Sequence, residues 1–488
     1  MSVVLAIDAG TTGVRTRAVF DDGRPSVSSY REFTQYFPRP GWVEHDATEI
    51  WDAVVATMAT VVAEVGGPIA SIGITNQRET VVAWDRRTGT PVAHAIVWQD
   101  RRTAARCDSL APYLPLVRRT TGLVLDPYFS GTKAAWLLEN HETPPAPHLA
   151  IGTIDTWLVW KLTGGSVFAT DPSNASRTML FDITTMQWSN DLCNLLGVPM
   201  SALPEVRPSS GDFGVTSSVA GVPDGVPVSG VAGDQQAALF GQACTRPGMA
   251  KNTYGTGSFV LLNVGTKCPA PTEGMLTTVA WDLGKGPVYA LEGSIFVTGA
   301  AVQWLRDGLG IIKDSSEIGP LAQSVPDSDG VYVVPAFTGL GSPWWDPYAR
   351  GTIVGITRGT TRAHIARAVV ESMVFQTVDA VKAMTAASGV QLAELRVDGG
   401  ASVMDAMLQH QSDELGVPVL RPADHETTAL GAAYLAGIAR GVWKDTHDVA
   451  RMWELDARFE PGTPSGRHHT WTRAVERSLR WAGEDAQD

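Results

Sequence analysis

Apolar and polar positions along the chain follow two periods, one typical of strands and one typical of helices. Two apolar runs lie within Val3 to Phe20, on either side of a turn of glycine and threonine, which predicts a β-hairpin. A similar pattern over 249–264 predicts a second hairpin. Over 71–85, two apolar strands flank a polar middle, and we expect a hairpin there too.

Strands followed by helices are predicted between and after these hairpins. Segments 148–164 and 225–242 each predict a strand and then a helix. Asp234 opens the second of these helices, where the helix dipole favours an acid. The pattern over 395–402 predicts a strand that ends in a double-glycine turn, and 427–437 predicts a helix of small residues that can pack closely.

The clearest helix covers 361–384, where apolar residues keep helical spacing and predict a stripe that faces the core. The stripe consists of Val370, Met373, Val374, Val378 and Val381. Because strands and helices alternate throughout the chain, the expected fold class is α/β. Pro247 and Gly248 interrupt the pattern near 241–250, so we expect domains over 1–245 and 246–488, with a surface extension from Arg458 onward.

Composition narrows the function classes. The chain has 488 residues and a formal net charge of -13, which argues against a nucleic-acid surface but leaves phosphorylated ligands open. No apolar run is long enough to span a bilayer, and the first residues lack a signal-peptide pattern. The four cysteines are scattered, which indicates reduced, mostly packed thiols. We therefore expect a cytoplasmic protein.

The first hairpin turn is a candidate phosphate site. Gly10 and Gly13 flank Thr11 and Thr12, whose amides and hydroxyls could face phosphate oxygens, and the nearby Arg15 could add positive charge. Asp8, at the end of the preceding strand, would then hold Mg²⁺ through a hard oxygen ligand. An ordinary hairpin turn rich in turn-forming residues explains the same pattern.

Well-known catalytic and nucleotide-binding motifs are missing from the chain. The sequence contains neither a GxxxxGK[ST] loop nor a GxGxxG fingerprint. It also lacks a GxSxG elbow, an HExxH helix and paired CxxC motifs. A nucleotide, if one binds, would therefore bind in a different architecture.

Three polar islands interrupt otherwise apolar stretches, at 76–80, 98–102 and 233–236. Arg78 beside Glu79 offers a donor fork and an acceptor pair, which suits neighbouring hydroxyls that both donate and accept. Trp98 could pack on the carbon atoms of such a ligand. Each island alone fits a surface pair, a core residue or a helix cap. The three together, with two glycine–threonine turns, favour a site for a polar substrate.

Twelve strings in order carry a resemblance to a known family. They are DAGTTGVRTR, GWVEHD, GITNQRET, VWQDRRT, TGLVLDPYFSGTK, TIDTWLVWKLTGG, NASRTML, GDQQAALFGQ, KNTYGTG, VVPAFTGLGSPWWDPYARG, VDGGAS and TALGAAYLAG. The chain resembles the FGGY carbohydrate kinases from Ala6 to about Arg458, and among them the members that phosphorylate glycerol. The resemblance implies two actin-like (ribonuclease H-like) domains with a central cleft.

The resemblance also implies an activity and a set of site residues. The γ-phosphoryl group of ATP would pass, with Mg²⁺, to a terminal hydroxyl of glycerol to give sn-glycerol 3-phosphate. Asp234 matches the catalytic base, and Asp8 matches the acid near the metal. The residues that match the family's glycerol contacts are Arg78, Glu79, Trp98, Tyr128, Asp234, Gln235 and Phe259. Those that match its nucleotide contacts are Thr11, Thr12, Gly13, Arg15, Thr256, Gly299, Gln303, Gly400 and the position of Met404.

Two positions depart from the family pattern. Met404 stands where an asparagine is common at the adenosine end, and methionine cannot make that hydrogen bond, so we expect weaker or altered base recognition. Gly13 stands where a serine is common, so one hydroxyl contact is lost and the backbone amide must serve.

Two other interpretations stay open at this point. The chain could be another FGGY kinase, acting on xylulose, gluconate or another polyol, although Trp98 and Phe259 leave little room for a longer sugar. It could also be a catalytically weak nucleotide-binding protein that kept the fold, an idea that only Met404 supports. We expect glycerol and ATP as partners, no nucleic acid, no insertion into a membrane, and a homodimer or homotetramer.

Overall fold

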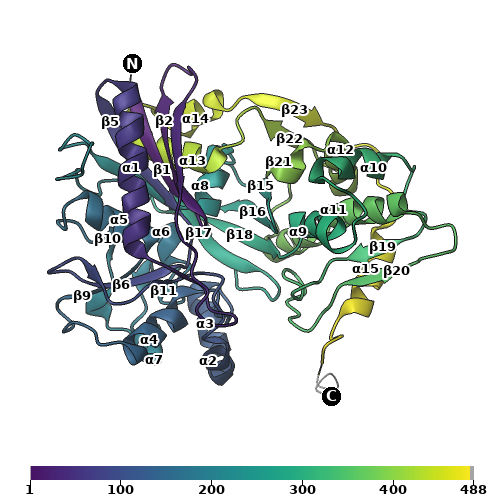
Figure 1. The fold of residues 1–488 in the computed structure, drawn as a ribbon, viewed down its shortest axis with the longest axis horizontal. Helices are drawn as coiled ribbons and strands as arrows, with labels where there is room; N and C mark the ends of the chain where they lie inside the picture. The colour runs from purple at the N-terminus through teal and green to yellow at the C-terminus, as the bar shows by residue number, and fades with distance from the viewer. Residues whose placement is uncertain (1, 484–488) are drawn as a thin grey trace.

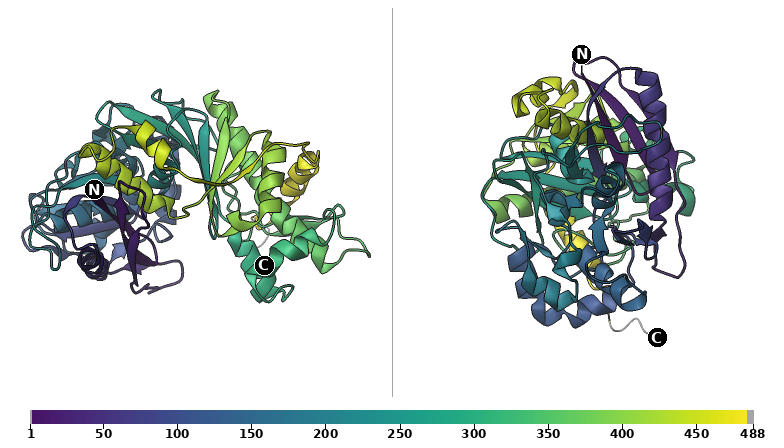
Figure 2. Two further views of the ribbon diagram at one scale, coloured as in Figure 1. Left: turned by 90° about the horizontal axis from the view of Figure 1, so that it is seen from above. Right: turned by 90° about the vertical axis from the view of Figure 1, so that its left-hand side faces the viewer.

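The computed structural model describes residues 2–483, so residue 1 and residues 484–488 of the expected domains lie outside the described part. The chain forms two lobes that lie side by side (Figures 1 and 2), each built around a mixed β-sheet. The expected α/β class is confirmed, because helices cover both sheets.

The first sheet has five strands and contains the predicted first hairpin. Its order is β14 (Val228–Gly233), β5 (Ile69–Asn76), β1 (Val3–Ala9), β2 (Gly13–Phe20) and β3 (Val27–Glu32). β1 pairs antiparallel with β2 and parallel with β5, which pairs parallel with β14. The carboxyl ends of β1, β5 and β14 therefore meet at one edge of the sheet, where α/β proteins gather ligand groups.

The two faces of this sheet are covered by helices that are distant in sequence. Because side chains alternate along β1, Leu5 and Ile7 pack with α1 (Ala47–Val65), whereas Val4 and Ala6 pack with α13 (Thr427–Ala439). α13 is the predicted small-residue helix, and its close packing is confirmed: a Cβ added at Gly431 would lie 1.8 Å from the Ala237 carbonyl oxygen. The second half of the chain thus returns to cover the first sheet.

The second sheet has seven strands and contains the predicted hairpin at 249–264. Its order is β17 (Leu276–Asp282), β18 (Pro287–Ile295), β16 (Ser258–Gly265), β15 (Met249–Tyr254), β21 (Glu394–Gly399), β22 (Val419–Pro422) and β23 (Leu455–Phe459). α8 (Asp234–Gly241) and α13 share one apolar cluster with residues of both sheets, including Val4 and Leu261. The two lobes are therefore joined by a common core around these helices (Figure 1).

The segment 71–85 does not form the expected hairpin. β5 belongs to the first sheet, whereas β6 (Val81–Asp85) pairs in a separate sheet with β7 (Thr90–Pro91), β8 (Ala95–Ile96) and β9 (Leu149–Thr153). That sheet also includes β4 (Glu44–His45). The polar middle crosses from one sheet to the other, with Glu79 in the left-handed region at φ 61°. The segment therefore connects two sheets and does not form a hairpin turn.

The long helix and the end of the chain form a further packed unit. α11 (Arg362–Ser388) contains the predicted stripe, and all five of its residues are buried. The segment from Arg458 is more than the expected surface extension, because α15 (His468–Ser478) buries Trp471 against Phe375 of α11. The indole Nε1 of Trp471 also donates to Asp379 Oδ2 at 2.8 Å. An apolar face with a hydrogen-bonded indole explains why the segment docks.

Shorter elements complete the described chain. The remaining helices are α2 (Ala104–Ser109), α3 (Leu114–Thr121), α4 (Ser130–Asn140), α5 (Ile154–Leu162), α6 (Pro172–Ala175), α7 (Asn190–Leu196), α9 (Gly299–Gln303), α10 (Ile318–Gln323), α12 (Asp405–Leu415) and α14 (Thr446–Met452). Two-stranded sheets pair β10 (Ala169–Thr170) with β13 (Glu205–Val206), β11 (Phe181–Asp182) with β12 (Gln187–Trp188), and β19 (Tyr332–Val334) with β20 (Thr352–Val354). All four cysteines are free thiols, as predicted. Within residues 2–483, no helix combines the length and apolar character needed to cross a membrane.

Candidate active site

The edge where β1, β5 and β14 end brings three predicted site residues to one place. Asp8 lies on β1, Arg78 follows β5, and Asp234 follows β14 at the start of α8. The Arg78 Nε atom lies 3.2 Å from Asp234 Oδ1. A Cβ added at Gly233 would come within 2.7 Å of the Arg78 side chain, so the glycine lets the arginine pass close to the strand.

Arg78 is buried and is held by partners from both lobes. Its side chain is 2 % exposed. Nη1 donates to Glu292 Oε2 at 2.5 Å and Nη2 donates to Glu292 Oε1 at 3.2 Å, a bidentate pair. Nη2 also donates to the Tyr128 hydroxyl at 3.2 Å. The planar fork is thus held in one orientation by residues of both lobes, because Glu292 lies on β18.

Glu79 is held by a second arginine that the sequence analysis did not single out. The Arg177 Nε atom donates to Glu79 Oε1 at 2.6 Å, and Arg177 Nη2 donates to Glu292 Oε1 at 3.0 Å. Burial raises the pKa of Glu79, although both arginines oppose the shift. Burial would also raise the pKa of Glu292, but Arg177, Arg78 and Lys251 outweigh it and hold that pKa at about 2.

Glu292 and Arg177 are the site-supporting residues that sequence reasoning missed. Arg177 lies in the string NASRTML, which carries the family resemblance without a role for the arginine. Glu292 interrupts the apolar strand β18, where every residue from Tyr289 to Ile295 is buried. An acid in a strand that is buried along its length needs a buried cation, and that signal could have found it.

Aromatic rings border the Arg78–Glu79 cluster. The Trp98 ring meets the Tyr128 ring edge to face at 5.7 Å, and the Phe259 ring centroid lies 6.0 Å from the Arg78 guanidinium carbon. Trp98 also joins this cluster to the first hairpin turn, since its Nε1 donates to the Thr11 hydroxyl at 3.0 Å. The aromatic rings therefore lie next to both the Arg78–Glu79 cluster and the first hairpin turn.

The Asp234 carboxyl group is affected both by its burial and by two neighbouring cations. Its side chain keeps 30 % exposure, so one face is open to a ligand. Burial raises its pKa, while Arg78 and Lys251 oppose the shift. Lys251 is itself buried, with its pKa lowered to about 8 by burial, and its Nζ donates to the Gln235 amide oxygen. Gln235 is thus tied to the same group through Lys251.

The first hairpin turn is closed by a hydrogen bond from the Gly10 amide to the Gly13 carbonyl at 3.0 Å. Arg15, in β2, forms an ion pair with Glu426, the residue before α13. Arg17 pairs in the same way with Asp424. The face of β2 that carries these arginines therefore points toward the segment that leads into α13.

The second hairpin turn gathers another set of predicted residues. The Thr256 carbonyl, between β15 and β16, accepts the amides of Thr298 at 2.9 Å and Ala300 at 3.0 Å. Gly299 begins α9, which ends at Gln303. A Cβ on Gly299 would lie 2.6 Å from the Gly255 carbonyl oxygen, so only glycine fits. β21 runs parallel to β15 in register and places Gly400 directly after the pair Tyr254–Gly399.

Met404 lies apart from the polar cluster, at the start of α12. It lines a small pocket together with residues of α10, α11 and α12, and Gly319 of α10 lies opposite, with an added Cβ 3.6 Å from the Met404 Cγ atom. The thioether supplies no hydrogen-bond donor to this pocket.

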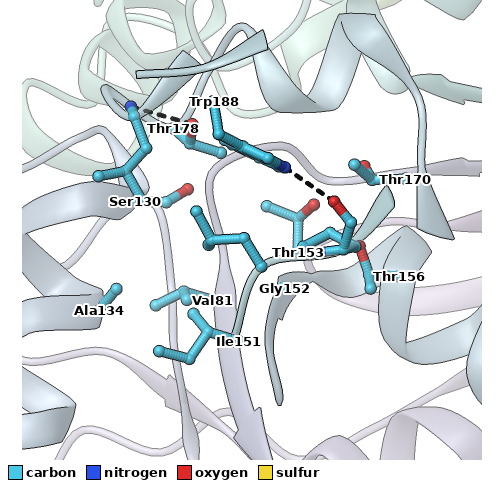
Figure 3. A pocket seen from close by; sticks show the side chains of 13 residues that line it. Val81, Ser130, Ala134, Ile151, Gly152, Thr153, Thr156, Thr170, Thr178 and Trp188 are labelled. Carbon is cyan, nitrogen blue, oxygen red and sulfur yellow. Dashed lines mark hydrogen bonds between the residues drawn. The ribbon is translucent and has the colours of Figure 1, made fainter. Parts of the chain in front are cut away.

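A separate cavity lies behind Glu79 and is not the predicted site. Figure 3 shows that mostly apolar and threonine side chains line it, among them Val81, Ile151 and Thr156. Ser130, on its wall, donates to the Glu79 carbonyl oxygen at 3.0 Å. The cavity therefore borders the backbone of the site without reaching its charged groups.

Magnesium is implied by the resemblance, and the carboxylates near Asp8 fit it. Burial and, to a smaller extent, the charges of Asp234 and Glu426 together raise the pKa of Asp8 to about 7, while Arg15 opposes the shift. Such an excess of negative charge favours a divalent cation. Within residues 2–483 no three acidic, histidine or cysteine side chains are arranged to hold a metal by themselves. Mg²⁺ commonly needs only one or two carboxylates when water and phosphate oxygens complete its shell.

Comparisons with known proteins agree with the resemblance. Models of the FGGY family of carbohydrate kinases match residues 3–241 with the N-terminal domain and residues 250–440 with the C-terminal domain. A protein named glycerol kinase from Trichlorobacter lovleyi is 55% identical, with 99% of this chain and 100% of the relative covered. Glycerol kinase 2 from Thermotoga maritima is 54% identical, with 99% of each covered.

Solved structures show the fold. Plasmodium falciparum glycerol kinase with ADP superposes with a TM-score of 0.92 at 36% identity, covering 98% of each chain. Gluconate kinase from Lactobacillus acidophilus superposes with a TM-score of 0.87 at 20% identity over 100% of this chain and 99% of that one, which shows the fold alone. The expected pair of actin-like α/β domains is confirmed.

Proposed function

We propose a function for this chain, which belongs to the FGGY family of carbohydrate kinases. It transfers the γ-phosphoryl group of ATP to glycerol and yields sn-glycerol 3-phosphate. The observation that carries the proposal is the placement of Asp234 beside Arg78 at the edge where three parallel strands end. Relatives more than half identical over their whole length are named glycerol kinases, which supports the same substrate.

Asp234 is the proposed general base. Its carboxylate is open on one side and is oriented by Arg78 on the other, so it can accept the proton of an attacking hydroxyl. The raised pKa brings the group closer to neutral pH, which suits proton acceptance. A positioned base of this kind contributes about 10²–10⁴-fold to the rate.

The Arg78–Glu79 cluster is the proposed binding site for the hydroxyls of glycerol. Arg78 and Tyr128 offer donors, while Glu79 and the Gln235 amide offer acceptors. Trp98 and Phe259 would contact the carbon atoms and limit the length of the ligand. A buried site built to pair with hydroxyls rejects analogues that lack them by roughly 10⁴–10⁵-fold.

The two hairpin turns are the proposed holders of the nucleotide. Thr11, Thr12 and Arg15 would bind phosphate oxygens from one lobe, and Thr256 from the other. Gly299, Gln303, Gly400 and the segment at Met404 would lie along the rest of ATP. Mg²⁺, held by Asp8, would neutralise charge on the phosphates. In-line transfer asks the protein chiefly for this positioning.

A panel of substrates tests the proposal. Purified protein is supplied with ATP, Mg²⁺ and either glycerol, xylulose or gluconate, and the release of ADP is followed. We expect turnover with glycerol that exceeds the other two by orders of magnitude. Faster turnover with xylulose or gluconate would replace glycerol as the substrate, and no turnover with any of the three would favour the weak nucleotide-binding protein. The homodimer or homotetramer and the cytoplasmic location stay predictions.

A further inference from the structure

Tyr30 covers Gly13 of the first hairpin turn. It lies on β3, the edge strand of the first sheet, and its hydroxyl occupies the space beside Gly13. A Cβ added at Gly13 would lie 2.6 Å from the Tyr30 Oη atom and 2.7 Å from the Arg31 carbonyl oxygen. The strand β3 therefore leaves no room for a side chain at residue 13, and the side chain of Tyr30 occupies that space.

The register of the sheet places Tyr30 on the same face as Arg15. β2 and β3 pair antiparallel with Arg15 directly opposite Tyr30, and side chains of directly paired residues share a face. The Arg15 guanidinium carbon lies 5.5 Å from the centre of the Tyr30 ring, a cation–π contact. This is the face on which Arg15 meets Glu426 and Arg17 meets Asp424. Tyr30 thus faces the side of the turn that we assign to the nucleotide.

The Tyr30 hydroxyl retains hydrogen-bonding capacity. Its distance to the Thr12 hydroxyl is 3.4 Å, a long contact in which either atom could donate. The residue is 48% exposed although its ring packs near Arg15. A phenol donor, a threonine hydroxyl and a guanidinium therefore surround one side of the turn, and all three favour an anionic oxygen.

We propose that Tyr30 is a further nucleotide-binding residue, whose hydroxyl donates to a terminal phosphate oxygen beside Thr12. The proposal rests on the proposed function, in which this turn binds the triphosphate of ATP. The hydroxyl supplies from β3 the contact that Gly13 cannot make. The ring in addition keeps Arg15 directed along the same face.

The variant Tyr30→Phe removes the hydroxyl and leaves the ring on Arg15. Binding is measured by calorimetry with the non-hydrolysable ATP analogue AMP-PNP and with AMP, both in the presence of Mg²⁺. We expect the Kd for AMP-PNP to rise about tenfold, as for loss of a hydrogen bond to a charged group. The Kd for AMP, which lacks the terminal phosphates, stays unchanged, as do the KM for glycerol and the Tm. Tyr113→Phe, at another exposed tyrosine, is the matched control and changes none of these values.

An unchanged Kd for AMP-PNP in Tyr30→Phe overturns the proposal, and so does an equal rise for AMP and AMP-PNP. Binding is read without turnover, so these outcomes do not depend on the phosphoryl acceptor. A wild-type protein that binds AMP-PNP but does not phosphorylate glycerol would instead contradict the proposed function. The Kd for AMP-PNP of wild type and of Tyr30→Phe would still decide whether Tyr30 binds the nucleotide.

Discussion

Glu292 accepts hydrogen bonds from both terminal nitrogens of Arg78, at 2.5 and 3.2 Å, although 214 residues separate the two in sequence. Arg78 follows β5 in the first sheet, and Glu292 lies on β18 in the second. Because Glu292 also accepts from Arg177, which holds Glu79, one buried carboxylate orients Arg78 directly and Glu79 through Arg177. The Arg78–Glu292 pair therefore makes the geometry of the site depend on how the two lobes are positioned.

Substituting Glu292→Gln should weaken both the fold and glycerol binding. The change leaves two buried guanidinium groups without their shared charge, and loss of one partner of a buried pair costs about 3 kcal/mol in free energy of unfolding. The KM for glycerol should rise because Arg78 is no longer fixed. Urea unfolding and steady-state kinetics measure these effects. Glu273→Gln, at a side chain 89% exposed, is the control, and equal behaviour of the two variants would contradict the role of Glu292.

Substituting Arg78→Ala should raise the KM for glycerol by about tenfold or more, since charged hydrogen bonds to the hydroxyls are lost. The KM for ATP should change much less, because the proposed phosphate contacts lie on the hairpin turns. Initial rates at varied glycerol and varied ATP separate the two constants. Arg87→Ala removes an exposed arginine that pairs with Asp85 and should leave both values unchanged. An unaltered KM for glycerol in Arg78→Ala would move the substrate elsewhere.

Lys133 should make the fold more stable as pH rises above 7. Burial lowers its pKa from 10.5 to about 7, while its Nζ donates to the Tyr128 carbonyl at 2.8 Å. Between these pH values the unfolded chain holds a proton that the folded chain has released, so the free energy of unfolding increases with pH, by at most about 1.4 kcal/mol per pH unit.

Chemical unfolding at pH 7, 8 and 9 checks this slope. Wild-type protein should gain stability relative to Lys133→Met as pH rises, whatever the offset that the substitution causes at pH 7. Lys285→Met, at an exposed lysine, should run parallel to wild type. A constant difference between wild type and Lys133→Met across this range would show that Lys133 keeps its ordinary pKa.

Local elements were predictable because neighbouring residues determine them. The hairpin at Val3–Phe20 and the helix that begins at Asp234 follow from apolar spacing, turn residues and an acid in the first helical turn. The site residues came from the family resemblance, and periodicity alone left each polar island ambiguous. The resemblance therefore predicts the residues of the turns and of the proposed glycerol site, but not the contacts between them.

Contacts between distant segments were not predictable from one sequence. The crossing of β5 and β6 into different sheets depends on which strands are available as partners, and the pattern over 71–85 fits either outcome. The docking of Trp471 on α11 depends on Asp379, nearly a hundred residues earlier. The hydroxyl of Tyr30 reaches Thr12 only because the sheet register sets it beside Gly13. Such pairings arise from tertiary packing.

Substituting Met404→Asn should improve recognition of the base. Methionine supplies no hydrogen-bond donor to the pocket at the start of α12, and an asparagine amide would offer both a donor and an acceptor. We expect the KM for ATP to fall several-fold and the preference for ATP over GTP to rise, as for one added hydrogen bond. Steady-state kinetics with both nucleotides measures this. Unchanged values for both would show that residue 404 does not face the base.

The most direct test of the account is the comparison of wild type with Asp234→Asn in one set of measurements. The amide keeps the size of the side chain but cannot accept the proton of the attacking hydroxyl. We predict that kcat for glycerol phosphorylation falls by at least ~10²-fold, while the Kd for glycerol stays within about tenfold of wild type. Near-normal kcat in Asp234→Asn would contradict the assignment of Asp234 as the base.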